Sequence, residues 1–84
     1  MANRELAALN ALGNEEEAVV ERIDVEGRAR RRLVEMGITP GTRVMISRRA
    51  PLGDPMEIRL RGYQLTLREA DARQILVSRG GGRA

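Results

Sequence analysis

The stretch RVMISRRAPLGDPMEIRLRGYQLTL, residues 43–67, decides the fold of this chain. Apolar side chains alternate with polar ones over residues 43–49, 56–61 and 63–68. A period of two is the pattern of a half-buried β-strand, so we expect three consecutive strands. Arg61-Gly62 separates the last two strands, and so short a connection containing glycine predicts a hairpin turn.

The other connection, APLGDP at residues 50–55, has the composition of a stiff turn. Pro51 presets its own backbone angle and suits the second position of a turn, and Gly53 can adopt a positive φ. Asp54 can accept hydrogen bonds from neighbouring backbone N–H groups. Pro55 can begin a strand at a position where no backbone N–H has to donate to the neighbouring strand. These residue types predict a rigid connection between two strands.

Leu52 is the one residue of this connection that turn chemistry does not require. An apolar side chain at the apex of a stiff loop either folds back onto the core or projects outwards as an anchor. Rigidity of the loop would lower the entropy cost of docking such an anchor on a partner. The sequence leaves both placements of Leu52 open.

The segments before this stretch predict one further strand and one helix. Leucines at every third position within residues 2–12 favour a short helix or a loop laid over the edge of the core. The β-branched residues of 18–23 predict a strand. Residues 28–36 carry apolar side chains at i, i+4 and i+7, which predicts a short amphipathic helix. Gly37 fits the left-handed cap of that helix, and Thr39-Pro40-Gly41 predicts a tight turn.

The segments after it complete a single small domain, expected to span residues 1–77. Residues 69–74 predict a brief helical turn with acidic residues at its start, and residues 75–77 predict a closing strand. Residues 78–84, SRGGGRA, have nothing to bury and are expected to form a disordered Gly/Arg tail. About five short strands with one or two short α-helices predict a mainly β fold, a small barrel whose closure removes sheet edges.

The side chains that most often carry catalysis and metal binding are missing. The chain has no cysteine, histidine, lysine or tryptophan, so all fifteen basic residues are arginine. No pair among the carboxylates, Ser47, Tyr63 and the arginines is spaced for acid–base work, and we expect neither an enzyme nor a cofactor. The consecutive glutamates of residues 15–17 could hold a divalent ion weakly. A solvated acidic turn is the simpler interpretation, so no metal site is predicted.

The composition also argues against nucleic acid and against insertion in a membrane. The net charge is +3, and Tyr63 is the only aromatic residue on which a base could stack. No run approaches the roughly 20 apolar residues of a membrane helix, and the N-terminus lacks the order of a secretory signal. We therefore expect a cytoplasmic protein.

Several side chains are of types enriched at protein interfaces. Met45 falls on the polar side of its strand, which indicates either an outward methionine or one that reaches the interior from a bent strand. Tyr63, beside Arg61, could bind a partner or pack on the core. The arginines of residues 28–32 are typical of a solvated helix face, although they could also meet an acidic partner or the anionic inner leaflet of a membrane.

A set of spaced blocks resembles the FeoA family of ferrous iron transport accessory proteins. The blocks span most of the chain, from about Leu9 to Val77, and Asn10-Ala11-Leu12-Gly13 fits the family's opening only loosely. They are Leu33, Met36-Gly37, Thr39-Pro40-Gly41, Ala50-Pro51-Leu52-Gly53-Asp54-Pro55, Arg61-Gly62-Tyr63, Leu67-Arg68, Ala72 and Ile75. The C-terminal domains of some iron-dependent repressors are similar to the same pattern.

The resemblance implies an SH3-like barrel that acts beside a FeoB-type membrane ferrous iron transporter with a GTP-binding domain. The alternative is an SH3-like regulatory module related to the repressor domains. Transition-metal binding is also a property of the family, and the oligomeric state, a homodimer included, stays open. The residues expected to bind the partner are Leu52, Gly53, Asp54, Met45, Arg61 and Tyr63. The residues expected to shape turns and caps are Gly37, Pro40, Gly41, Pro51, Pro55 and Gly62.

Overall fold

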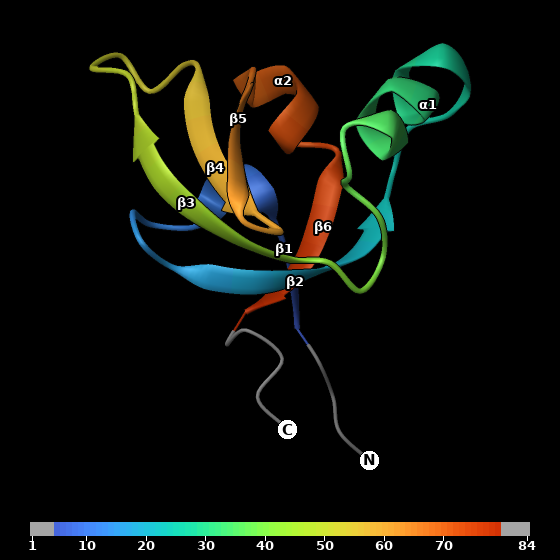
Figure 1. Ribbon diagram of the computed structural model, residues 1–84, viewed down its shortest axis with the longest axis horizontal. Helices are drawn as coiled ribbons and strands as arrows, with labels where there is room; N and C mark the ends of the chain where they lie inside the picture. Colours follow the sequence, from blue (N-terminus) through green and yellow to red (C-terminus); the bar gives the residue numbers. More distant parts are fainter. Residues whose placement is uncertain (1–4, 80–84) are drawn as a thin grey trace.

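The computed structural model describes residues 5–79 and consists of one antiparallel sheet with short helices (Figure 1). Its six strands pair in the order β1-β6-β2-β3-β4-β5. The elements in chain order are β1 (Leu6–Ala8), η1 (Leu9–Ala11), β2 (Glu17–Ile23), α1 (Gly27–Glu35), β3 (Arg43–Arg49), β4 (Met56–Leu60), β5 (Tyr63–Leu67), α2 (Glu69–Ala72) and β6 (Ile75–Arg79). The mainly β fold predicted from the alternating runs is confirmed.

The sheet curls around a single apolar core (Figure 1). Val44 and Ile46 of β3 and Ile58 of β4 are almost fully buried, as their alternation with polar neighbours predicts. The 3-10 helix η1 contacts α2, and the two lie within the curve of the sheet. The strand order ends at β1 and β5, which do not pair with each other among the described residues. The barrel is therefore not fully closed, contrary to the expectation that closure removes both edges.

Both ends of the domain differ from the sequence prediction. The segment expected to be a short helix or a loop contains η1, but it also contains β1, a sixth strand that pairs with β6 through Leu6↔Ser78 and Ala8↔Leu76. On its other side β6 pairs with β2 as far as Ala18↔Arg79, so the strand extends to Arg79, and Ser78 is buried. Ser78 and Arg79 thus belong to the sheet and not to the tail. The rest of the expected tail, residues 80–84, lies outside the described residues.

Helix α1 ends where Gly37 was expected to end it. The N–H of Gly37 donates to the carbonyl of Val34 (2.9 Å), and the N–H of Ile38 donates to the carbonyl of Leu33 (3.0 Å). These two bonds form a Schellman motif, which requires a left-handed residue at the position of Gly37, and its φ is +101°. Leu33 and Ile38 are both buried, so the motif also fastens the end of α1 to the core.

The predicted hairpin between β4 and β5 is present. Leu60 pairs with Tyr63 across the turn, and both turn residues have positive φ, +50° for Arg61 and +84° for Gly62. Two left-handed residues define the type I′ turn, whose twist matches that of the flanking strands. The turn fixes the register of the whole hairpin, from Leu60↔Tyr63 to Met56↔Leu67.

Candidate partner-binding surfaces

Leu52 projects from the molecule on a closed loop. The N–H of Gly53 donates to the carbonyl of Ala50 (2.7 Å), which makes residues 50–53 a tight turn with Pro51 at its second position. The N–H of Ala50 donates to the carbonyl of Pro55 (2.9 Å) and closes the base of the loop. The side chain of Leu52 is 95% exposed. Of the two placements that the sequence left open, the structure has the outward one.

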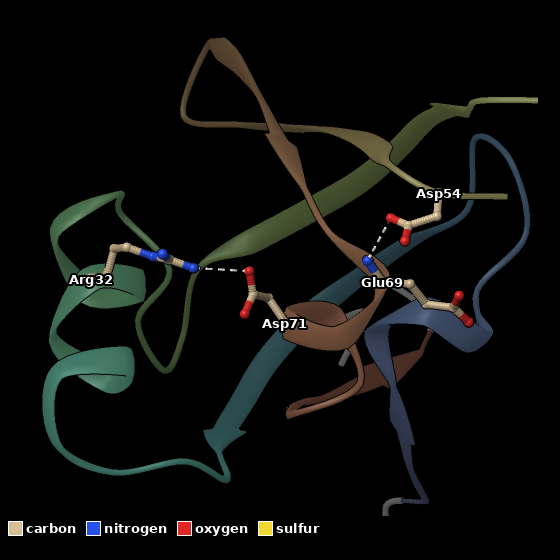
Figure 2. A network of polar contacts seen from close by, with 4 residues as sticks. All are labelled: Arg32, Asp54, Glu69 and Asp71. Carbon is tan, nitrogen blue, oxygen red and sulfur yellow. Dashed lines mark hydrogen bonds and ion pairs between the residues drawn. The ribbon is translucent and has the colours of Figure 1, made fainter.

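Asp54 acts as a cap for helix α2 (Figure 2). Its Oδ1 accepts a hydrogen bond from the backbone N–H of Glu69 (2.9 Å), the first residue of that helix. The expected partners of Asp54 were neighbouring N–H groups, whereas the actual partner is 15 residues away. Arg68, at the N-cap position, makes no side-chain capping bond within residues 5–79. Asp54 therefore satisfies a helix donor that local sequence leaves open.

Side chains from two other segments also bond to helix α2. Together with the Asp54 cap, we call these contacts the α2 junction. Nη2 of Arg32 in α1 donates to Oδ2 of Asp71 (3.1 Å), and Nδ2 of Asn10 in η1 donates to Oε2 of Glu69 (3.2 Å). Figure 2 shows the Arg32 and Asp54 contacts on either side of this short helix. The loop that carries Leu52 is thus connected to α1 through α2. No spacing in the sequence indicates this junction, because its members come from four separate segments.

We expect Asp54→Ala to lower the free energy of unfolding by about 1 kcal/mol, because the N–H of Glu69 loses its acceptor. Thermal unfolding followed by circular dichroism would show this as a fall in Tm of about 4–8 °C. Asp54→Asn is the matched control, since its amide oxygen can accept the same bond, and it should stay close to the parent. An alanine variant as stable as the parent would contradict the capping role.

Met45 and Arg61 lie on a different surface from the loop. Met45 is half-buried on the outer side of β3, opposite the buried Val44 and Ile46, so it does not reach the core. Arg61 is exposed at the β4–β5 hairpin, and its Nη2 donates to Oγ1 of Thr42 (3.1 Å). Four residues of β3 lie between Met45 and Ala50 at the base of the loop, a separation of about 17 Å at the rise of a strand. The six predicted partner-binding residues do not form one continuous patch.

Tyr63 contributes to the fold at the end of α1. Its hydroxyl donates a hydrogen bond to the carbonyl of Met36, the C-cap residue of the helix. A Cβ built on Gly37 would lie 2.5 Å from the same hydroxyl oxygen. The ring is 44% exposed, so Tyr63 is neither a core residue nor a free surface residue. It fastens β5 to the end of α1.

A groove runs beside the Leu52 loop. Its volume is about 470 Å³, and an ion pair between Nε of Arg48 and Oε1 of Glu57 (3.5 Å) forms part of its wall. The lining residues are Arg48, Arg49, Ala50, Pro51, Pro55, Glu57 and Thr66. Ala50, Pro51 and Pro55 give this lining an apolar part beside the stems of Arg48 and Arg49, which suits an apolar contact with a charged rim.

Two of the three consecutive glutamates, Glu16 and Glu17, are directed to different partners. Oε1 of Glu16 accepts from the N–H of Gly13 (2.9 Å), and its Oε2 pairs with Arg79 (3.0 Å). Glu17 pairs with Arg43 at 3.6 Å. Within residues 5–79 no group of three acidic side chains could hold a metal ion together. Glu17 therefore links β2 to β3, and Glu16, just before β2, links that end of the strand to β6.

Anaerobic titration with Fe²⁺ is expected to show at most weak binding to the isolated protein, because Glu16 and Glu17 are committed to separate arginines. Isothermal titration calorimetry would measure this. The double variant Glu15→Gln/Glu17→Gln should leave the titration unchanged. A stoichiometric site tighter than about 1 µM, abolished in the variant, would contradict the prediction.

Within residues 5–79, none of the helices has the length and apolar character needed to cross a membrane.

The sequence matches the FeoA domain family over residues 7–79. A curated relative from Porphyromonas gingivalis (strain ATCC BAA-308 / W83), an Fe(2+) transport protein A/Fe(2+) transporter FeoB fusion protein, is 36% identical over 69 residues. The alignment covers 82% of this chain, which spans only 8% of the fusion protein.

Solved structures share the fold over most of the chain. A FeoA-like protein from Clostridium acetobutylicum, solved by NMR, has a TM-score of 0.85 and 36% identity, with 99% of this chain and 95% of that chain covered. FeoA of Stenotrophomonas maltophilia in complex with zinc, described as a prokaryotic SH3 domain protein, has a TM-score of 0.72 and 28% identity, with 83% and 87% covered. The mainly β, SH3-like architecture is therefore shared with both.

IdeR of T. acidophilum shares the fold alone, with a TM-score of 0.80 at 18% identity, and this chain covers 37% of it. The likeness to part of a repressor that the sequence predicts is thus limited to the fold.

Proposed function

This chain belongs to the FeoA domain family, and from that premise we propose that it binds a FeoB-type membrane ferrous iron transporter and modulates iron uptake by protein–protein contact. The observation that carries the proposal is the fusion of a related domain with FeoB in one polypeptide of Porphyromonas gingivalis. Fusion keeps two domains at high effective concentration, which favours pairs that work in contact.

The Leu52 loop is the proposed anchor. Leu52 is 95% exposed on a turn closed by two backbone hydrogen bonds, and Asp54 fixes the loop to α2. An apolar side chain held in one place loses little entropy when a partner covers it. The groove beside the loop offers additional contact area. Gly53 and Asp54 would then position the anchor and would not themselves bind strongly.

In this proposal the chain does no chemistry and carries no cofactor. Transport and nucleotide hydrolysis belong to the partner, and the small domain alters their rate by binding. The protein would act in the cytoplasm, at the inner face of the membrane through its partner. A direct electrostatic contribution could come from the exposed arginines of α1, Arg28 and Arg31.

The test is direct association with a FeoB-type transporter reconstituted in lipid nanodiscs. The labelled protein is expected to bind in a saturable manner, as measured by biolayer interferometry, and to change the nucleotide hydrolysis rate of the transporter. Empty nanodiscs of the same lipids separate protein binding from membrane binding. Equal binding to empty and loaded nanodiscs would overturn the proposal. The repressor-module alternative rests on fold similarity alone.

A further inference from the structure

The outer face of the sheet has a second candidate surface around Met45, which we call the Met45 patch. Strand pairing places Glu17, Met45 and Arg59 side by side across β2, β3 and β4. Arg43 lies two residues from Met45 on β3, and Arg61 lies in the turn that follows β4. Both border the same depression, of about 340 Å³. Directly opposed residues of antiparallel strands project from one face of a sheet, so these side chains form one surface.

The Met45 patch carries a net positive charge. Its lining includes three guanidinium groups and one carboxylate, a net charge of +2. Glu17 pairs with Arg43 at 3.6 Å, which leaves the charges of Arg59 and Arg61 without an acidic partner among the described residues. These two guanidinium groups donate to neutral oxygens instead.

Those neutral contacts hold the two guanidinium groups in place. Nη2 of Arg59 donates to Oε1 of Gln64 (3.3 Å), and Nη2 of Arg61 donates to Oγ1 of Thr42 (3.1 Å). A guanidinium group has five N–H donors, so each keeps most of its donors for another molecule. The patch therefore presents two oriented, uncompensated cations beside a half-buried methionine.

We propose that the Met45 patch docks an acidic, extended segment of a partner protein, with one apolar side chain of that segment over Met45. Carboxylates suit the planar forks of Arg59 and Arg61, and methionine adapts its shape to an apolar neighbour. A second copy of this chain across a two-fold axis would set the arginines against one another, so charge argues against it. A nucleic acid is disfavoured because the patch offers no aromatic ring for stacking.

Binding at the Met45 patch does not require the transporter. The Met45 patch lies towards the far end of β3 from the Leu52 loop and would bind an acidic segment whether or not the FeoB contact exists. Its test therefore uses a defined probe. The probe is a short synthetic peptide of glutamate and aspartate with one central leucine, added to ¹⁵N-labelled protein with its methionine methyl groups also labelled.

NMR titration is expected to shift the methyl signal of Met45 and the amide signals of Arg59 and Arg61, and to leave Leu52 unshifted. Replacing the central leucine of the peptide by glycine should weaken binding, because the apolar contact is lost. About 0.5 M NaCl should abolish the shifts, since a surface charge contact is screened.

The double variant Arg59→Gln/Arg61→Asn is expected to lower the affinity for the peptide at least about tenfold. Asparagine tolerates the positive φ at position 61, so the hairpin is retained. If the double variant unfolds, the single variant Arg59→Gln is used for the same affinity measurement. The matched control, Arg28→Gln/Arg31→Gln, removes the same charge from the exposed face of α1 and should leave the affinity unchanged.

Four results would overturn the proposal. The first is the absence of shifts at the Met45 patch at millimolar peptide. The second is an equal loss of affinity in both double variants, which would indicate attraction by net charge alone. The third is equal or stronger binding of an oligothymidine of the same charge, which would indicate a nucleic-acid surface. Concentration-dependent shifts at the patch without peptide would indicate self-association and would also overturn it.

Discussion

Leu52→Asp is expected to weaken association with the FeoB-type transporter at least about 30-fold while leaving Tm within about 2 °C of the parent. Covering a leucine side chain contributes roughly 1.5–3 kcal/mol, and a carboxylate at the same place would have to be desolvated. The side chain is 95% exposed, so its replacement removes almost no packing from the folded chain. Biolayer interferometry on nanodiscs and circular dichroism measure the two effects separately.

Two further substitutions at the same position separate the apolar contact from the added charge. Leu52→Asn has nearly the shape of aspartate without its charge, and it should also weaken association. Leu52→Met keeps an apolar side chain of similar volume and should restore most of the affinity. Normal binding of the asparagine variant would show that the leucine is not an anchor, and a large fall in Tm would show that it stabilises the fold.

Gly37→Ala is expected to lower the free energy of unfolding by about 2–3 kcal/mol, which corresponds to a fall in Tm of roughly 10–20 °C for a domain of this size. A residue with a side chain at φ +101° costs about 1–2 kcal/mol. The new Cβ would also lie 2.5 Å from the hydroxyl oxygen of Tyr63. The ring can move aside only by giving up its hydrogen bond to Met36, which costs about 1 kcal/mol more.

Gly41→Ala is the matched control for this prediction. Gly41 has a similar φ, +94°, but nothing lies within 4 Å of a Cβ built there, so only the backbone cost applies. Urea unfolding should therefore show the Gly37 variant to be less stable than the Gly41 variant by about 1 kcal/mol. In the Gly37→Ala background, Tyr63→Phe should add little further loss. Equal stabilities of the two alanine variants would contradict the role of Tyr63.

The parts of the fold that local patterns determine were predictable from the sequence. The alternation of residues 43–49 and the turn residues Arg61-Gly62 place β3 and the β4–β5 hairpin, because side-chain period and turn type are local properties. Gly37 likewise marks the end of α1. In contrast, β1 exists only through its pairing with β6, almost 70 residues away, and no local signal in Leu6–Ala8 requires it.

The candidate surfaces were less predictable than the fold. Turn chemistry predicts a stiff loop at residues 50–55, but it does not determine the direction of Leu52, which depends on how the loop lies on the rest of the molecule. The hydrogen-bond partner of Asp54 was equally unpredictable from the sequence, since the N–H of Glu69 comes close only after α2 forms. The Met45 patch arises from three strands, so Arg43 and Arg59 were not singled out from the sequence.

The hydrogen bond from the N–H of Ala50 to the carbonyl of Pro55 makes the loop suitable for protein engineering. It closes the loop below its apex, while Asp54 holds its descending arm on α2. Foreign sequence inserted next to Leu52 would leave both contacts in place, and each doubling of the loop length costs only about 0.6 kcal/mol. Insertion after Asp54 would instead separate Asp54 from Pro55 at the base of the loop, and so carry its carboxylate away from Glu69. The apex is therefore a suitable site for displaying grafted peptides, and the descending arm is not.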